Sequence, residues 1–246
     1  MFPEILGLIP WRHHVEIIAK SKSLDEALFY MTQTIENGWS RALLLNYIGA
    51  NLYEAKGKAP NNFELTLPDP QSDLAKEVVK DPYNFDFLTL RTNYYEKELE
   101  DALTTNITKF LLELGQGFAY VGRQVTVEVE GDEYVLDLLF YHLKLRCYVV
   151  IELKAGRFSP KDLGQLGFYI SAVNHQFKTE AENPTVGLLI CKEKKNTVAK
   201  YALESSTHPI GISEYELSQM IPENYKSSLP SIEEIEDEFS DTEIVG

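Results

Sequence analysis

The segment VLDLLFYHLKLRCYVVIELK, residues 135–154, decides the fold. Two runs of apolar, strand-forming residues lie on either side of a short polar connection, which predicts a β-hairpin. Both runs also carry charges, with Asp137 in the first and Glu152 and Lys154 in the second. Because an unpaired charge in an apolar sheet costs several kcal/mol, these three residues are candidates for a functional site.

The register of this hairpin can be derived from its turn. A two-residue turn at Lys144-Leu145 pairs residues whose numbers sum to 289, which places Asp137 opposite Glu152. Opposite residues have Cβ atoms about 4.5–5.5 Å apart, and Lys154 shares their face because side chains alternate along a strand. A shift by one residue would separate the two carboxylates onto different faces.

Two carboxylates at that separation repel each other unless a cation lies between them. Hard oxygen ligands suit Mg²⁺, and Mn²⁺ is its expected substitute. The alternative is a solvent-facing patch in which Glu152 and Lys154 form a weak surface ion pair and Asp137 is an ordinary exposed residue. The residues alone leave both interpretations open.

Composition sets limits on the class of protein. The 246 residues include 44% hydrophobic residues and carry a formal net charge of −15. No apolar stretch is long enough to span a membrane, and Cys147 and Cys191 lie in apolar runs typical of reduced core residues in a cytoplasmic protein. The net charge argues against a nucleic-acid partner. However, residues 230–246 hold seven acids and no base, whereas residues 142–178 hold six bases and two acids.

The pattern along the chain predicts an α/β protein with a mainly helical N-terminal region. The order α-β-β-β-α-β-α-β from residue 93 onward predicts a mixed β-sheet flanked by helices. We expect a helical region at 1–80, a core domain at 81–217 and an acidic tail at 218–246. The predicted helices are 12–20, 24–36, 39–56, 71–80, 93–114, 160–176 and 196–204. The predicted strands are 63–67, 118–129, 133–141, 146–154, 184–191 and 208–215.

Asp137, followed after fourteen residues by Glu152-Leu153-Lys154, resembles the core motif of the PD-(D/E)XK nucleases. Glu113 matches the acidic residue that many of these enzymes carry ahead of the strands. The segments NFDFL, FLLELGQGFAYVGRQVTVEV, LDLLFYHLKLRCYVVIELKAG and GLLIC resemble the YhcG-type bacterial nuclease family over residues 80–217. IPWRHH…ENGWSR resembles part of that family's winged-helix-like N-terminal domain.

Gln165 and Tyr169 match the Q-x-x-x-Y motif of the RecB-like branch of this superfamily. They are four residues apart and therefore share a helix face. The resemblance implies that both side chains orient the site or the nucleic-acid backbone. One departure from the pattern is that the proline expected before the aspartate is absent, since Val135 and Leu136 precede Asp137.

The resemblance implies a restriction-endonuclease-like fold and a Mg²⁺-dependent nuclease that hydrolyses phosphodiester bonds of DNA. Asp137, Glu152 and the Leu153 carbonyl would hold the metal, and Glu113 a water or a second metal. Lys154 would position water or stabilise charge. A homodimer would supply two sites for two strands. The alternatives are a catalytically silent nucleic-acid- or partner-binding protein of the same fold, and an RNA substrate.

Overall fold

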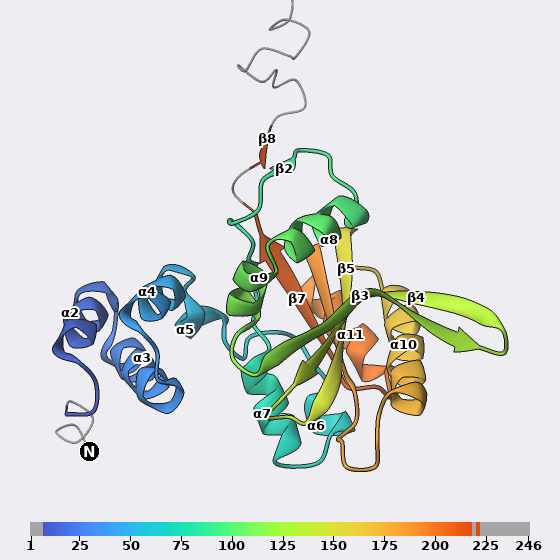
Figure 1. Ribbon diagram of the computed structural model, residues 1–246, viewed down its shortest axis with the longest axis horizontal. Helices are drawn as coiled ribbons and strands as arrows, with labels where there is room; N and C mark the ends of the chain where they lie inside the picture. Colours follow the sequence, from blue (N-terminus) through green and yellow to red (C-terminus); the bar gives the residue numbers. More distant parts are fainter. Residues whose placement is uncertain (1–6, 218–219, 222–246) are drawn as a thin grey trace, which may run out of the picture.

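The computed structural model describes residues 7–217 and 220–221. Its centre is a six-stranded mixed sheet in the order β1-β7-β6-β5-β4-β3 (Figure 1). The strands are β1 (Tyr83–Asn84), β3 (Phe118–Val129), β4 (Asp132–His142), β5 (Cys147–Arg157), β6 (Val186–Glu193) and β7 (Ile210–Glu216). The pairs β3–β4 and β4–β5 are antiparallel, and the remaining pairs are parallel.

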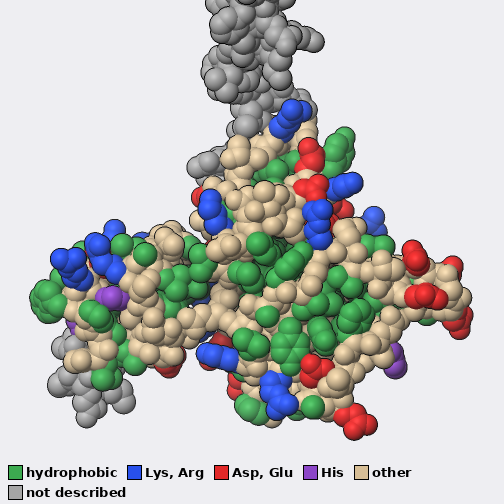
Figure 2. Space-filling model, viewed as in Figure 1, with side chains coloured by type: hydrophobic (Ala, Val, Ile, Leu, Met, Phe, Trp, Pro, Cys, Tyr) green, Lys and Arg blue, Asp and Glu red, His purple; other side chains and the backbone are tan. Residues whose placement is uncertain are grey.

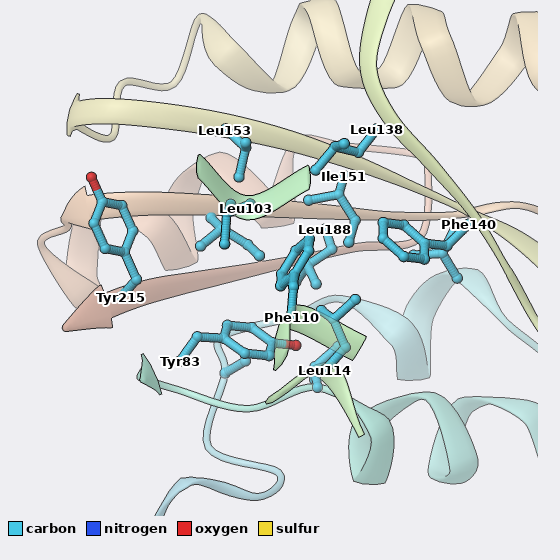
Figure 3. Close-up of a cluster of buried hydrophobic side chains, with 14 of the residues drawn as sticks. Tyr83, Leu103, Phe110, Leu114, Leu138, Phe140, Ile151, Leu153, Leu188 and Tyr215 are labelled. Atoms are coloured by element: carbon cyan, nitrogen blue, oxygen red, sulfur yellow. The ribbon is translucent and has the colours of Figure 1, made fainter. Parts of the chain in front are cut away.

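Helices cover both faces of the sheet. Helices α8 (Glu96–Thr105) and α9 (Ile107–Leu114) pack on one face, and α10 (Asp162–Gln176) and α11 (Asn196–Glu204) pack on the other. Figure 3 shows Leu103 and Phe110 of the first pair among Leu138 and Ile151 of the strands. The predicted order α-β-β-β-α-β-α-β and the mixed sheet are therefore confirmed.

The N-terminal helices form a separate hydrophobic cluster around Tyr30 and Leu44. They are α2 (Trp11–Lys20), α3 (Leu24–Asn37), α4 (Arg41–Gly49) and α5 (Leu52–Ala55), on the left of Figure 1. The next helices, α6 (Phe63–Thr66) and α7 (Gln71–Val78), contribute Phe63 and Ala75 to the core of the sheet. The domain boundary near residue 80 stays a prediction.

Two short strands, β2 (Leu90–Arg91) and β8 (Met220–Ile221), pair outside the main sheet. The predicted acidic tail, residues 218–246, lies outside the described residues except for β8. Cys147 and Cys191 are buried and free, as predicted. Among the residues described, no helix is both long and apolar enough to cross a membrane.

Three of the predicted elements were wrong in detail. The segment predicted as a strand at 63–67 is the helical turn α6, closed by a hydrogen bond from Leu67 N to Phe63 O at 2.8 Å. The predicted helix 39–56 is interrupted at Asn51, whose φ is 50°. The predicted helix 93–114 is interrupted at Asn106, whose φ and ψ are −103° and 35° and whose side chain donates to Ala102 O at 3.0 Å.

Helix α10 begins later than predicted, at Asp162 instead of Pro160. The Asp162 side chain accepts a hydrogen bond from Ser159 N at 2.8 Å, and a carboxylate in the first turn suits the positive end of the helix dipole. The loop between β5 and α10 therefore includes residues 158–161.

Candidate active site

The predicted register of the central hairpin is confirmed from Leu138 to His142, but the ladder stops before the predicted pair of Asp137 and Glu152. Leu138 pairs with Ile151 and His142 with Cys147, so that partner numbers sum to 289. The connection is a four-residue turn at 143–146, in which Arg146 takes a φ of 50°, rather than the two-residue turn predicted. Regular pairing ends at Leu138 and Ile151, which lie next to the two carboxylate residues.

Asp137 lies where β4 and β5 cease to pair. Its Oδ2 accepts a hydrogen bond from the backbone N–H of Leu153 at 2.9 Å. The alternation of side chains along β4 is also interrupted here, because Leu136 and Leu139 both belong to the core under α10 while Leu138 belongs to the other core. The carboxylate thus joins two strands whose backbone pairing has ended.

Glu152 is almost completely buried, with 1% of its surface exposed. Its Oε1 accepts a hydrogen bond from Lys154 Nζ at 3.0 Å, whereas its Oε2 is buried and has no hydrogen-bond partner in the described part of the chain. Burial, together with the charge of Asp137, raises the pKa of Glu152 to about 7. Burial likewise raises the pKa of Asp137. The charge of Asp137 therefore disfavours the charged form of Glu152.

Helix α8 brings two further carboxylates to this pair. Glu96 Oε2 lies 3.6 Å from Lys154 Nζ. Glu100, one turn later, is buried and accepts a hydrogen bond from the side chain of Gln124. Burial, together with the charge of Asp137, raises the pKa of Glu100. Both residues were missed by the sequence analysis, although their spacing of four residues places them on one helix face.

The structure does not bring Glu113 to the other predicted residues. Its Oε1 accepts hydrogen bonds from Lys80 Nζ at 2.8 Å and from the backbone of Asn84 at 2.9 Å. The next residue, Leu114, lines a cavity together with His142. His142 lies five residues from Asp137 along β4, a separation of about 16 Å at the usual strand rise. The interruption at Asn106 separates α9, which carries Glu113, from α8, which carries Glu96 and Glu100.

Gln165 and Tyr169 do lie beside the site and contact each other. Gln165 Nε2 donates to the hydroxyl of Tyr169 at 3.1 Å, and that hydroxyl donates to the carbonyl of Val135 at 2.8 Å. Burial, followed by the charges of Glu152 and Asp137, raises the pKa of Tyr169, and the hydrogen bond from Gln165 opposes this rise. The pair therefore fastens α10 to β4 two residues before Asp137.

A surface hollow of about 490 Å³ opens beside Lys154, between α8, β5 and the start of α10. Arg157, Lys161 and Gln165 also line this hollow. Arg157 forms an ion pair with Glu193 at 2.6 Å, and Lys161 is exposed. The hollow thus presents three cationic side chains together with the carboxylates of Glu96 and Asp162.

The donor set fits a hard divalent cation. Glu152 Oε2 is an acceptor that lacks a hydrogen bond, and the adjacent Asp137 carboxylate is disfavoured in its charged form by the same surroundings. Throughout the described residues, no group of three or more His, Cys, Asp or Glu side chains is arranged to hold a metal ion. A site here would therefore consist of two carboxylates completed by backbone oxygen and water, as is usual for Mg²⁺.

Models of known protein families match most of the chain. The family model described as "YhcG PDDEXK nuclease domain" matches residues 76–230, and the model described as "DUF1016 N-terminal domain" matches residues 2–55. The chain is 33% identical over 227 residues to the Escherichia coli (strain K12) protein named "Putative nuclease YhcG". This alignment covers 91% of the chain but 58% of that relative, so the chain spans less than two thirds of its length.

Two solved structures show weaker similarity. A repair endonuclease from Pyrococcus abyssi is 15% identical with a TM-score of 0.35, over 52% of this chain and 49% of its own. EndoMS in a complex with double-stranded DNA is 19% identical with a TM-score of 0.35, over 54% of this chain and 46% of its own.

Proposed function

The chain belongs to the YhcG PDDEXK nuclease family, and we propose that it is a Mg²⁺-dependent nuclease that hydrolyses phosphodiester bonds of DNA. One observation carries the proposal: Glu152 presents a buried oxygen without a hydrogen-bond partner, beside both Asp137 and Lys154. A surface ion pair, the alternative left open by the sequence, does not bury its carboxylate in this way.

In this proposal, Asp137, Glu152 and the carbonyl of Leu153 hold the metal. When bound, a divalent ion polarises a phosphate oxygen and lowers the pKa of a coordinated water. Glu100, rather than Glu113, is the carboxylate of the preceding helices that would hold a water or a second ion. Glu113 is instead engaged by Lys80 and Asn84.

The other predicted residues act through charge and position. Lys154 places an ammonium group next to the carboxylates, where it can stabilise the negative charge that develops on the phosphoryl group or hold the attacking water. Its hydrogen bond to Glu152 Oε1 fixes that ammonium group. Gln165 and Tyr169 maintain the position of β4, and thereby of Asp137, relative to α10.

The remaining parts of the proposal concern partners and compartment. The N-terminal helices would supply contacts to DNA or to a partner protein, and a homodimer would place one site on each strand of a duplex. The buried cysteines Cys147 and Cys191 are free, which suits a reducing compartment such as the cytoplasm.

The test is a cleavage assay with Mg²⁺, with Mn²⁺ and with EDTA, on linear duplex, branched and single-stranded DNA and on RNA. Wild type is compared with Lys154→Ala and with Lys200→Ala, a control that removes an exposed lysine of α11. We expect metal-dependent cutting of DNA that Lys154→Ala lowers by about 10²–10³-fold and that Lys200→Ala leaves unchanged. The proposal would be overturned if folded wild type left every substrate uncut, or if Lys154→Ala cut DNA as fast as wild type.

A further inference from the structure

An exposed pair of aromatic rings lies beside the candidate active site. Tyr134 of β4 and Phe168 of α10 have ring centroids 4.6 Å apart. Both rings are only partly covered, with 38% of Tyr134 and 37% of Phe168 exposed to solvent. The two residues come from different elements, so the pair forms part of the surface between β4 and α10.

This pair continues the surface of the hollow next to Lys154. Lys161, which directly precedes α10, and Gln165 and Phe168 of that helix are exposed and recur at helical spacing. The first two of these line the hollow together with Lys154. Tyr134 directly precedes Val135, whose carbonyl is fastened to Tyr169. One face of α10 therefore leads from the lysine of the active site to the aromatic rings.

The charges along this path change from mixed at the hollow to acidic farther away. Lys154, Arg157 and Lys161 line the hollow together with Glu96 and Asp162. Beyond the rings, the tip of the β3–β4 hairpin carries the exposed acids Glu128, Glu130, Asp132 and Glu133, which form the red group at the right of Figure 2. A nucleic-acid strand that follows the basic side chains is repelled by this acidic tip. The path available to the nucleic acid therefore ends near Tyr134 and Phe168.

We propose that Tyr134 and Phe168 form a stacking platform for unpaired nucleobases, and that the substrate of this site is DNA with a single-stranded segment, such as a tail or a branch. This inference rests on the proposed nuclease function and specifies its substrate class. Every base offers a flat face to an aromatic ring, but in an intact duplex those faces are already covered by neighbouring base pairs. A platform of this kind therefore selects strands whose bases are free.

The experiment measures binding in EDTA, so that it does not depend on cleavage. The probes are a duplex that carries a short single-stranded tail with 2-aminopurine in the tail, and a blunt duplex of the same sequence. Tyr134→Ala and Phe168→Ala each remove an aromatic ring. Tyr134→Phe keeps the ring and removes only the hydroxyl, whereas Phe168→Leu keeps apolar volume without a ring. Tyr201→Ala removes an exposed tyrosine of α11 as a matched control.

We expect wild type to bind the tailed duplex more tightly than the blunt one and to quench the 2-aminopurine fluorescence. Tyr134→Ala, Phe168→Ala and Phe168→Leu should each weaken binding of the tailed probe by about 5- to 100-fold. Tyr134→Phe and Tyr201→Ala should bind it as wild type does. Equal affinity of wild type for both probes, or unchanged binding by the folded Phe168→Leu variant, would overturn the inference.

This outcome is separable from the outcome for the proposed function. Ring-dependent binding of the tailed probe without any cleavage in Mg²⁺ or Mn²⁺ would support the platform and contradict the nuclease. Equal cleavage of tailed and blunt duplexes by wild type and by Tyr134→Ala would support the nuclease and contradict the platform.

Discussion

The hydroxyl of Tyr169 donates a hydrogen bond to the backbone carbonyl of Val135 at 2.8 Å, and so connects α10 to β4 at the point where β4 leaves β5. Asp137 is two residues farther along the same strand. Tyr169 does not need to touch a substrate in order to matter, because its hydrogen bond holds the backbone that carries a proposed metal ligand.

Replacement of this hydroxyl in Tyr169→Phe should therefore affect the site more than the fold. We expect a loss of about 1–3 kcal/mol in the free energy of unfolding, because the hydroxyl takes part in two hydrogen bonds, one from Gln165 and one to Val135. The affinity for Mn²⁺ or the cleavage rate should fall by about 10- to 100-fold, as for groups that orient metal ligands. Urea denaturation and Mn²⁺ titration provide the two readouts. If Mn²⁺ affinity and rate match wild type, the positioning role is wrong.

The raised pKa of Glu152 predicts how stability depends on pH. Without metal, the folded protein keeps a proton on Glu152 up to about pH 7, whereas the unfolded chain loses it near the ordinary value of 4.5. The folded state binds more protons between these values, so the free energy of unfolding decreases as pH rises through this interval. The contribution of Glu152 is fully present below pH 4.5 and is lost above pH 7.

The Glu152→Gln variant removes this term. In EDTA, we expect the variant to be more stable than wild type at pH 8 by about 1–3 kcal/mol, with a smaller difference at pH 5. Urea denaturation of both proteins at the two pH values measures the change. A wild type that gains stability relative to the variant between pH 5 and pH 8 would show that the Glu152 carboxyl is not disfavoured in its charged form.

Glu113 and Glu100 should have different roles. Glu113→Ala leaves Lys80 buried without its carboxylate and should lower the free energy of unfolding by about 3–5 kcal/mol. Glu113→Gln, which keeps an oxygen acceptor, should fold better and cut DNA at the wild-type rate. Glu100→Gln should retain stability but lose about 10-fold or more in rate. Full activity of Glu100→Gln together with inactivity of folded Glu113→Gln would restore the assignment based on sequence.

Features that depend on neighbouring residues could be predicted from the sequence. The pairing of Leu138 with Ile151 follows from a short turn and from alternation along two strands, and it survives the change from a two-residue to a four-residue turn. The contact between Gln165 and Tyr169 follows from helix geometry. Both predictions rest on local regularity, which is alternation along two strands joined by a short turn in one case and spacing along one helix in the other.

The position of Glu113 could not be predicted in this way. Leu103, Ile107 and Phe110 keep helical spacing across Asn106, so the pattern gives no sign that the helix is interrupted there. The partner of Glu113 is Lys80, which is 33 residues away and reaches it only through the tertiary fold. The carboxylates that α8 brings to Lys154 and Asp137 depend on the same packing of helix on sheet.

The central claim is that Asp137 and Glu152 together hold a divalent metal, and calorimetric titration with Mn²⁺ tests it most directly. Wild type should bind Mn²⁺ at pH 7.5, a pH above the raised pKa of Glu152. Asp137→Ala and Glu152→Gln should each lose the binding heat, while Glu113→Gln should retain it. Titration curves that are the same for wild type, Asp137→Ala and Glu152→Gln would contradict the account.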